Sequence, residues 1–396
     1  MNIGLRTAAG PRRAAAGRQG VLAALLAGTT LVGAACGPPV DDAPDTLWGT
    51  ATAVEELAIG VEFGADEYMF GWIRSLAVAG DGTMYVSDSQ ANVVRMYDAA
   101  GTFVRTIGRQ GQGPGEYSSA PYLRVRDDGT LLMRNPGSAR ISFFSPAGEY
   151  VDSLSARSGI GPIELDPQGN LYLLRGRGGS EMVKYSVEGE ELGRIEMPPR
   201  ETTSNTFLLG REDVWAFPLQ TVSAWSPLGY PVTGRTDAYD IELRKPDGTV
   251  HVRRDLAPVP LASDERAEWE VFRRGILAQQ RAMNDDQEAD PIPSVKPFFR
   301  DLWVGDDGRI WVWRYVAAVK RDDIEPVPEQ PDRPLLTWRE PWTYDVFEPD
   351  GTLLGSVVVP ERLRPFAFRG DRIWGAIIDE DGIEKVVRLR AIPEGS

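Results

Sequence analysis

Apolar and polar residues alternate in short runs along most of the chain, and turn-forming residues separate the runs. Within residues 72–108 this pattern predicts four strands, around Leu76 and Val78 and at Met84–Ser87, Asn92–Tyr97 and Phe103–Ile107. Two pairs, Asp81-Gly82 and Ala100-Gly101, stand between the runs, where such pairs favour tight hairpins. We therefore expect one antiparallel unit of four strands in this segment.

The same unit recurs along the chain, with turn glycines at matching places. The second and third copies cover residues 121–154 and 160–197, and a fourth and a fifth follow. The turn pairs of these copies are Asp128-Gly129, Ala147-Gly148, Gln168-Gly169, Glu188-Gly189, Asp247-Gly248, Asp307-Gly308 and Asp350-Gly351. The second strand is predicted at Val214-Trp215 in the fourth copy and at Trp311–Trp313 in the fifth. A repeat of about 40 residues is typical of propeller blades.

The last copy contains only three predicted strands, at Phe366–Phe368, Arg372–Ile378 and Lys385–Arg390. A fourth strand can come from the other end of the domain, where Thr50–Ile59 has strand character. The residues after it, beginning with Ile59-Gly60, echo the motif that begins with Ile107-Gly108 after the first unit. We therefore expect the N-terminal strand to complete the last unit and to close a ring that has no exposed sheet edges.

The first unit resembles an NHL-type repeat. The resemblance rests on Asp81–Asp88 (DGTMYVSD), on the strand that ends in Tyr97-Asp98, and on the connection Ile107–Tyr117 (IGRQGQGPGEY). The mature chain as a whole resembles the six-bladed β-propeller lipoproteins of bacteria. This resemblance implies an all-β fold, in which residues 49–396 form one six-bladed β-propeller of four-stranded antiparallel blades.

Two segments depart from the strand pattern. Ser263 is a helix-capping residue type, and Trp269, Phe272 and Ile276 recur after it at helical spacing. We therefore expect a helical insertion at about residues 262–284, between the fourth and fifth blades. Residues 322–334 contain four prolines among acidic residues, which predicts a loop.

The first 36 residues have the character of an export signal. A basic stretch without acids leads into an apolar run, Val21–Ala35, which is too short for an ordinary transmembrane span. The run ends in Gly33-Ala34-Ala35-Cys36, which resembles a bacterial lipobox with Gly33 in place of the usual leucine. We expect lipidation at Cys36, a tether at residues 37–48, and a location in the bacterial envelope, at the periplasm or cell surface. The alternative is a plain secretory signal cleaved near Ala35.

The composition limits the partners and the kinds of catalytic or metal site that the chain can have. The formal net charge of −15 repels a phosphate backbone, which argues against nucleic acid as a partner. Cys36 is the only cysteine, so no intramolecular disulfide can form. His251 is the only histidine, which excludes poly-histidine zinc sites and Cys/His nucleophile pairs. Because it follows the Asp247-Gly248 turn, His251 is predicted on an outer strand with a structural role.

Polar residues end the predicted second strands. Counting from the turn glycines places Asp88, Asn135, Arg175 and Arg314 at equivalent positions, with Arg134 adjacent to Asn135. In propellers these strand ends approach the channel mouth on one face, so three arginines there would form an anion-binding ring. The alternative is that each arginine pairs with a neighbouring acid and holds the blades together.

Three further patterns concern this part of each unit. An aromatic residue precedes an arginine by two positions in Trp72–Arg74, Tyr122–Arg124 and Phe298–Arg300, where it either lines the same face or packs between blades. Asp88 and Asn135 carry oxygen ligands that suit calcium, although no full ligand set can be assigned. The glycine-rich run Gly108–Gly115 lies between strands, which indicates an interblade connection rather than a phosphate loop at a helix.

These observations favour a non-enzymatic binding module or scaffold of the cell envelope, which presents one face to an envelope protein or to a small anionic ligand. No cofactor is predicted, and the membrane is contacted through the N-terminal lipid only. The alternative is a metal-dependent hydrolase or lyase, with calcium and carboxylates in the central channel. A third hypothesis is a mainly structural envelope protein. The fold by itself does not decide among them, because propellers serve many functions.

Overall fold

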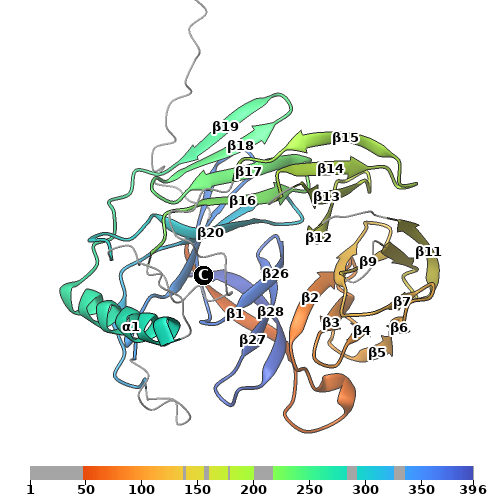
Figure 1. Cartoon of the computed structure of the whole chain (residues 1–396), viewed down its shortest axis with the longest axis horizontal. Helices are drawn as coiled ribbons and strands as arrows, with labels where there is room; N and C mark the ends of the chain where they lie inside the picture. The colour runs from red at the N-terminus through yellow and green to blue at the C-terminus, as the bar shows by residue number, and fades with distance from the viewer. Residues whose placement is uncertain are drawn as a thin grey trace, which may run out of the picture. The chain divides into compact units, whose positions relative to one another are not determined.

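The computed structural model describes residues 48–136, 140–155, 160–176, 179–199, 217–282, 292–324 and 335–395. Strands form nearly all of the regular structure, with one α-helix, Ser263–Ala282 (α1), and a short 3₁₀ helix, Asp66–Tyr68 (η1), in this part of the chain (Figure 1). Neither of these helices is long and apolar enough to cross a membrane. The predicted export signal, with Cys36, lies outside the described residues.

The first three predicted units form three separate sheets, each with four antiparallel strands in chain order. The strands of the first sheet are β2 (Ile73–Val78), β3 (Met84–Asp88), β4 (Val93–Tyr97) and β5 (Phe103–Thr106). Those of the second are β8 (Tyr122–Val125), β9 (Leu131–Asn135), β10 (Arg140–Phe144) and β11 (Tyr150–Ser155). Those of the third are β12 (Ile160–Leu165), β13 (Leu171–Arg175), β14 (Glu181–Tyr185) and β15 (Glu191–Glu196). The turn pattern of the sequence predicted these units correctly.

The fourth sheet corrects one prediction. Its strands are β16 (Thr221–Ser226), β17 (Tyr230–Arg235), β18 (Asp240–Lys245) and β19 (Gly248–Arg253). The last turn is Asp247-Gly248, as expected, but the second strand is β17 and not Val214-Trp215, which lie outside the described residues. The turn before β17 uses Gly229, at a φ of 90°, without the acidic or amide residue that precedes this glycine in the first, second, third and fifth copies, so the sequence pattern missed it.

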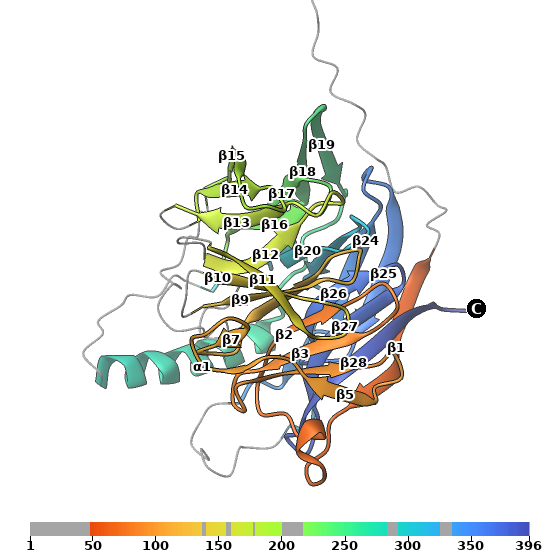
Figure 2. The same ribbon diagram turned by 90° about the vertical axis from the view of Figure 1, so that its right-hand side faces the viewer.

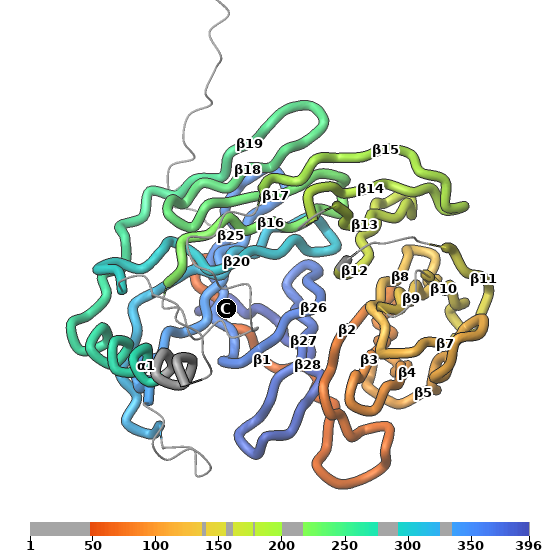
Figure 3. The backbone as a smooth tube through the Cα atoms, in the orientation of Figure 1, coloured from red at the N-terminus to blue at the C-terminus, as the bar shows by residue number. Residues whose placement is uncertain are grey.

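The remaining long strands form one eight-stranded sheet, in the order β20-β21-β24-β25-β1-β28-β27-β26. They are β20 (Phe299–Val304), β21 (Ile310–Arg314), β24 (Trp342–Phe347), β25 (Leu353–Val359), β1 (Gly49–Ile59), β28 (Glu384–Pro393), β27 (Arg372–Ile378) and β26 (Arg364–Arg369). Strand β1 runs antiparallel to β28, and its first residues, Gly49–Thr52, run parallel to Gly355–Val358 of β25. The N-terminal strand therefore lies beside the C-terminal strand (Figure 3).

Two short strand pairs lie in the connections. Strands β6 (Arg109–Gln110) and β7 (Glu116–Tyr117) pair in parallel within the glycine-rich run, which joins the first two sheets as expected. Strands β22 (Val319–Lys320) and β23 (Trp338–Arg339) pair at the base of the second excursion. Residues 325–334 of that excursion lie outside the described residues.

Neighbouring sheets contact each other where their first strands begin and again where those strands end. The N–H of Leu123, near the start of β8, donates to Ser75 Oγ in β2 at 3.0 Å. At the other ends of the first strands, Arg369 of β26 donates to the carbonyl of Val78 of β2 at 3.1 Å. The sheets therefore share two faces. On one face the first strands begin, the second strands end, and the chain passes from one sheet to the next. We call it the connection face. The opposite one, which carries turns such as Asp81-Gly82, is the turn face.

The core lies between the sheets. All five residues of β3 and of β9 are buried, whereas the outer strands β11 and β15 are mostly exposed. A cluster that includes Leu76, Met84 and Tyr97 of the first sheet packs against Trp374 of β27 and Val386 of β28. Four-stranded antiparallel sheets that bury their faces against one another in this way are the arrangement of a β-propeller.

Helix α1 follows β19 and precedes β20, as the sequence predicts, and so belongs to the connection face (Figure 2). Glu268 of the helix accepts hydrogen bonds from the backbone N–H and the hydroxyl of Thr337, at 2.8 and 2.6 Å. Glu265 forms an ion pair with Lys296 at 2.7 Å, and the Lys296 side chain is fully buried. Trp269 packs against Phe217, which gives the helix an apolar contact as well.

Candidate functional site

The sequence correctly predicts which residues end the second strands. Asp88, Asn135, Arg175 and Arg314 are the last residues of β3, β9, β13 and β21, and Arg134 precedes Asn135. All of these strands end on the connection face. Their side chains are nevertheless used in different ways, so each is described by the groups that it contacts.

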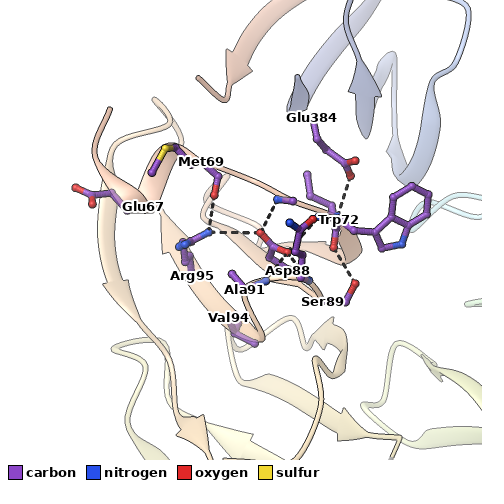
Figure 4. Close-up of polar contacts among 12 residues, drawn as sticks. Glu67, Met69, Trp72, Asp88, Ser89, Ala91, Val94, Arg95 and Glu384 are labelled. Carbon is purple, nitrogen blue, oxygen red and sulfur yellow. Dashed lines mark hydrogen bonds and ion pairs between the residues drawn. The ribbon is translucent and has the colours of Figure 1, made fainter. Parts of the chain in front are cut away.

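Asp88 is 1% exposed, and the chain itself holds its carboxylate (Figure 4). Oδ2 accepts the N–H of Gly71 and Oδ1 the N–H of Gln90, both at 2.9 Å, and two further backbone N–H groups donate to Oδ1 at 3.2 Å. Arg95 Nη1 lies 3.8 Å from Oδ2. These contacts fix the connection before β2 and the turn after β3, which is a structural use of the carboxylate.

Two of the three predicted arginines have partners within their own sheet. Arg314 Nε lies 3.5 Å from Oδ1 of Asp345, a fully buried carboxylate that also accepts the Tyr239 hydroxyl at 2.7 Å. Burial, followed by the charge of Asp345, raises the pKa of Tyr239 well above its ordinary value. Arg175 Nη1 donates to the Tyr185 hydroxyl at 2.6 Å. Arg314 thus follows the expected alternative, in which an arginine pairs with an acid.

Arg134 differs from the other two. Arg134 is only 8% exposed, and its Nη1 is buried without a hydrogen-bond partner. Among the described residues, no carboxylate lies within 4 Å of its guanidinium, and burial lowers the pKa of Arg134. Its neighbour Asn135 accepts a hydrogen bond from Ser118 Oγ at 3.2 Å.

Arg74 and Arg134 are both neighbours of Tyr122, at the boundary between the first two sheets. Tyr122 of β8 is directly opposite Arg134 of β9, so both side chains point to the same side of the second sheet. The guanidinium of Arg74, from β2 of the first sheet, lies 5.8 Å from the centre of the Tyr122 ring. Arg74 Nε is also buried without a hydrogen-bond partner. We call Arg74, Tyr122 and Arg134 the arginine site.

Local backbone geometry places Arg74. Strand β2 pairs Ile73 with Asp88 and Ser75 with Ser87, so Arg74 is the extra residue of a bulge. A bulge re-aims the side chain of its extra residue. Arg300 of β20 stands at the corresponding bulge and has other partners: Glu340 at 3.1 Å and the Tyr315 ring at 4.1 Å.

The aromatic residue of the first triplet has a different partner. Trp72 is 48% exposed, and the guanidinium of Arg364 from β26 lies 3.9 Å from its ring centre. Arg364 also pairs with Glu384, which accepts the N–H of Ile73 at 2.8 Å. Burial raises the pKa of Glu384. The Trp72 ring is thus part of the junction between β2 and β26.

Sequence reasoning placed Arg74 only in an aromatic–arginine triplet and did not connect it with Arg134. It did not identify Arg235 at all. Arg235 ends β17 at the position equivalent to Arg175 and Arg314, and its guanidinium pairs with Asp237 at 2.8 Å. The misplaced second strand of the fourth unit concealed it. Correct placement of the Gly229 turn would have given the signal.

The remaining candidates have structural settings. His251 lies on β19, the outer strand of its sheet as predicted, with Nδ1 2.8 Å from Asp240 Oδ1. Within the described ranges, no three acidic, histidine or cysteine side chains gather where they would hold a metal ion. Asp88 therefore belongs to no such cluster in this part of the chain.

A protein family described as a 6-bladed beta-propeller matches residues 64–130, the segment that holds the first sheet and the start of the second. Together with the stacked four-stranded sheets, this match decides the fold. The chain is a β-propeller. The match covers one part of the propeller, and no curated protein matches the chain.

Solved structures with a similar trace are distant. A putative exported protein from Bacteroides fragilis has 9% identity over 86% of this chain and 94% of its own, with a TM-score of 0.46. Virginiamycin B lyase from Staphylococcus aureus has 12% identity over 84% of this chain and 98% of its own, with a TM-score of 0.40. Regucalcin, a calcium-binding protein from Agrobacterium tumefaciens, has 13% identity over 86% and 96%, with a TM-score of 0.38.

Proposed function

We propose that this protein is an exported, lipid-anchored β-propeller that binds a small anion at the arginine site, and that it is a binding module rather than an enzyme. In this proposal the propeller has six blades. The strands β26–β28 take β1 as their fourth strand, so the eight-stranded sheet consists of two blades, and the N-terminal strand closes the ring. The pairing of β1 with β28 supports this part of the proposal.

One observation carries the binding function: the guanidinium of Arg134 is buried without a counter-ion among the described residues. A buried charge without compensation costs several kcal/mol. On a chain with a net charge of −15, carboxylates are abundant, yet none of those that the structure describes lies within 4 Å of the Arg134 guanidinium. A bound anion would compensate the charge, which makes this position a binding site rather than a junction between blades.

The chemistry of the site favours a carboxylate or a phosphate group. A guanidinium presents several N–H donors in a planar fork, which matches two oxygens of such an anion. Arg74 and Arg134 belong to two different sheets and both neighbour Tyr122, so an anion bound between them would contact both sheets. Ligand binding would then stabilise the boundary between the first two sheets.

Thermal unfolding with inorganic phosphate and with acetate as probes tests this proposal. A ligand of the folded state raises the unfolding midpoint with its concentration. We expect one of the probes to raise the midpoint of the wild type, and Arg134→Gln and Arg74→Gln each to abolish the rise. Arg194→Gln is the matched control, because Arg194 lies on an outer strand in exposed ion pairs with Glu191 and Glu181. An equal rise in all variants would show that the anion binds elsewhere.

A further inference from the structure

The arginine site contains two guanidiniums that lack a counter-ion in the part of the chain that the structure describes. Nε of Arg74 and Nη1 of Arg134 are buried without a hydrogen-bond partner, and no described carboxylate lies within 4 Å of either guanidinium. An arginine side chain keeps its charge at neutral pH, because its pKa is far higher. The site therefore presents two positive charges for a ligand to balance.

Tyr122 links the two arginines. It pairs with Arg134 across β8 and β9, and the guanidinium of Arg74 lies 5.8 Å from its ring centre. Burial lowers the pKa of Arg134 and Tyr122 offsets part of this change, so the Tyr122 hydroxyl acts electrostatically on that guanidinium. One residue further along each strand, the Leu123 N–H donates to Ser75 Oγ at 3.0 Å. The backbone thus fixes the strands that carry these side chains before any ligand binds.

We propose that the ligand of the arginine site is a phosphate monoester, bound as its dianion, rather than a carboxylate or a phosphate diester. This inference rests on the proposed anion site and names the class of ligand that the site takes. A phosphate monoester carries a charge of about −2 at neutral pH, so one ligand balances both guanidiniums. A carboxylate or a diester carries a single negative charge and would leave one guanidinium without a counter-ion.

The number of donors favours the same class of ligand. A phosphate monoester has three terminal oxygens that accept hydrogen bonds, whereas a carboxylate has two. The guanidiniums of Arg74 and Arg134 supply donors for two of these oxygens, and the Tyr122 hydroxyl supplies a donor for the third. A ligand with three acceptor oxygens therefore uses all three side chains of the site.

The exposure of the three side chains gives the ligand a direction. Arg134 is only 8% exposed, whereas Arg74 and Tyr122 are half-buried. The phosphate group therefore reaches Arg134 from the side of Arg74 and Tyr122, and the group esterified to it stays toward solvent. We expect the site to select the charge and shape of the phosphate and to accept different substituents.

Three small probes separate the classes of anion. Methyl phosphate and dimethyl phosphate share a tetrahedral phosphorus and differ in charge, and acetate represents a carboxylate. Calorimetric titration of the full chain at neutral pH and constant ionic strength measures the affinities. We expect methyl phosphate to bind about tenfold more tightly than either other probe. Equal affinities would overturn the dianion and leave the anion site standing, whereas no binding of any probe would overturn the anion site itself.

Replacement of one hydroxyl tests the third donor. Tyr122→Phe keeps the ring beside Arg74 and removes the hydroxyl, so we expect about tenfold weaker binding of methyl phosphate. Tyr185→Phe is the matched control, because its hydroxyl also lies beside an arginine, Arg175, but in the third sheet. The control should bind methyl phosphate as the wild type does. Unchanged binding in Tyr122→Phe would overturn the match of three donors to three oxygens.

A last arm distinguishes a soluble monoester from a lipid headgroup. The soluble probe is glycerol 3-phosphate, and the lipid probes are phosphatidylcholine vesicles with phosphatidic acid, a monoester, or with phosphatidylglycerol, a diester. Glycerol 3-phosphate that binds as tightly as methyl phosphate supports a soluble source. Sedimentation with phosphatidic acid vesicles that Arg134→Gln abolishes supports a headgroup, and either result retains the monoester. Sedimentation with phosphatidylglycerol vesicles that Arg134→Gln abolishes would overturn it.

Discussion

At the scale of single residues, the connection face contains two kinds of buried charge. Asp88 is surrounded by backbone N–H donors that compensate its charge, whereas Arg134 lacks a counter-ion among the described residues. Both were predicted as site residues from the same positional argument. Their different environments predict opposite effects of substitution.

Replacement of Arg134 by methionine removes a buried charge and keeps most of the side-chain volume. We expect Arg134→Met to raise the free energy of unfolding by roughly 1–3 kcal/mol in the absence of anions, and to lose the stabilisation by phosphate or acetate. Urea unfolding with and without the probe measures both effects. Arg175→Met is the control, because loss of the bond to Tyr185 should lower the free energy of unfolding by about 1 kcal/mol. A large loss of stability in Arg134→Met would mean that the charge is compensated.

Asp88→Asn should lower the free energy of unfolding by about 3 kcal/mol, because an amide offers one acceptor oxygen where the carboxylate offers two. Asp81→Asn is the matched control. Asp81 is exposed and accepts the N–H of Thr83 within its own turn, a bond that asparagine can also accept. Denaturant unfolding of both variants gives the comparison. A similar small effect in the two would show that the Asp88 network contributes little.

The positions of these residues were predictable, and their partners were not. Counting from a turn glycine identifies the end of a strand, because the spacing within a hairpin is local. The partner of Arg314 is Asp345, on a strand that follows after a long excursion, and the partner of Arg364 is a ring at the start of the first sheet. Such pairs depend on how strands and sheets assemble, which a single sequence does not encode locally.

At the scale of elements, strand β1 is held by charge as well as by backbone pairing with both of its neighbours. Glu56 of β1 pairs with Arg372 of β27 at 2.8 Å and with Arg388 of β28 at 3.1 Å. The hydrogen bond from Arg372 lowers the pKa of Glu56 below its ordinary value of 4.5. These contacts link the first described strand to the last two.

The lowered pKa gives Glu56 a defined dependence on pH. The contribution of Glu56 to stability is fully present above pH 4.5, the ordinary pKa that it has in the unfolded chain, and it is lost as the pH falls through the lower pKa of the folded protein. We therefore expect Glu56→Gln to be less stable than the wild type at pH 7, with the difference shrinking below pH 4. Urea unfolding at several pH values, with the exposed Glu62→Gln as control, measures it. A difference in the free energy of unfolding that stays constant with pH would contradict a lowered pKa of Glu56 in the folded protein.

The elements themselves were largely predictable, because each strand alternates in polarity and most turns carry a glycine after an acidic, amide or small residue. The failure was in the fourth unit, where Gly229 follows Leu228 and no such residue announces the turn. The helix was predictable because the insertion changes the apolar period and Trp269 and Phe272 bury one side.

At the scale of the whole molecule, the alternative function as a calcium-dependent hydrolase or lyase remains a prediction of the sequence, and it can be tested directly. We expect the unfolding midpoint of the purified protein to be the same in calcium and in excess EDTA, because the described residues show no acidic cluster suited to the metal. Differential scanning calorimetry measures the midpoint. A calcium-dependent rise of several degrees would favour the channel enzyme over the binding module.

The pairing of β1 with β28 has a consequence for how the protein is made. Strand β1 finds its antiparallel partner only in β28, Glu384–Pro393, which is made long after it. Contacts between such distant segments form slowly, because a very long loop must close first. A nascent chain therefore cannot complete this pairing before Glu384–Pro393 have been synthesised. With the export proposed above, this delay would help to keep the chain unfolded during translocation, and β1 would pair with β28 only after Glu384–Pro393 have crossed the membrane.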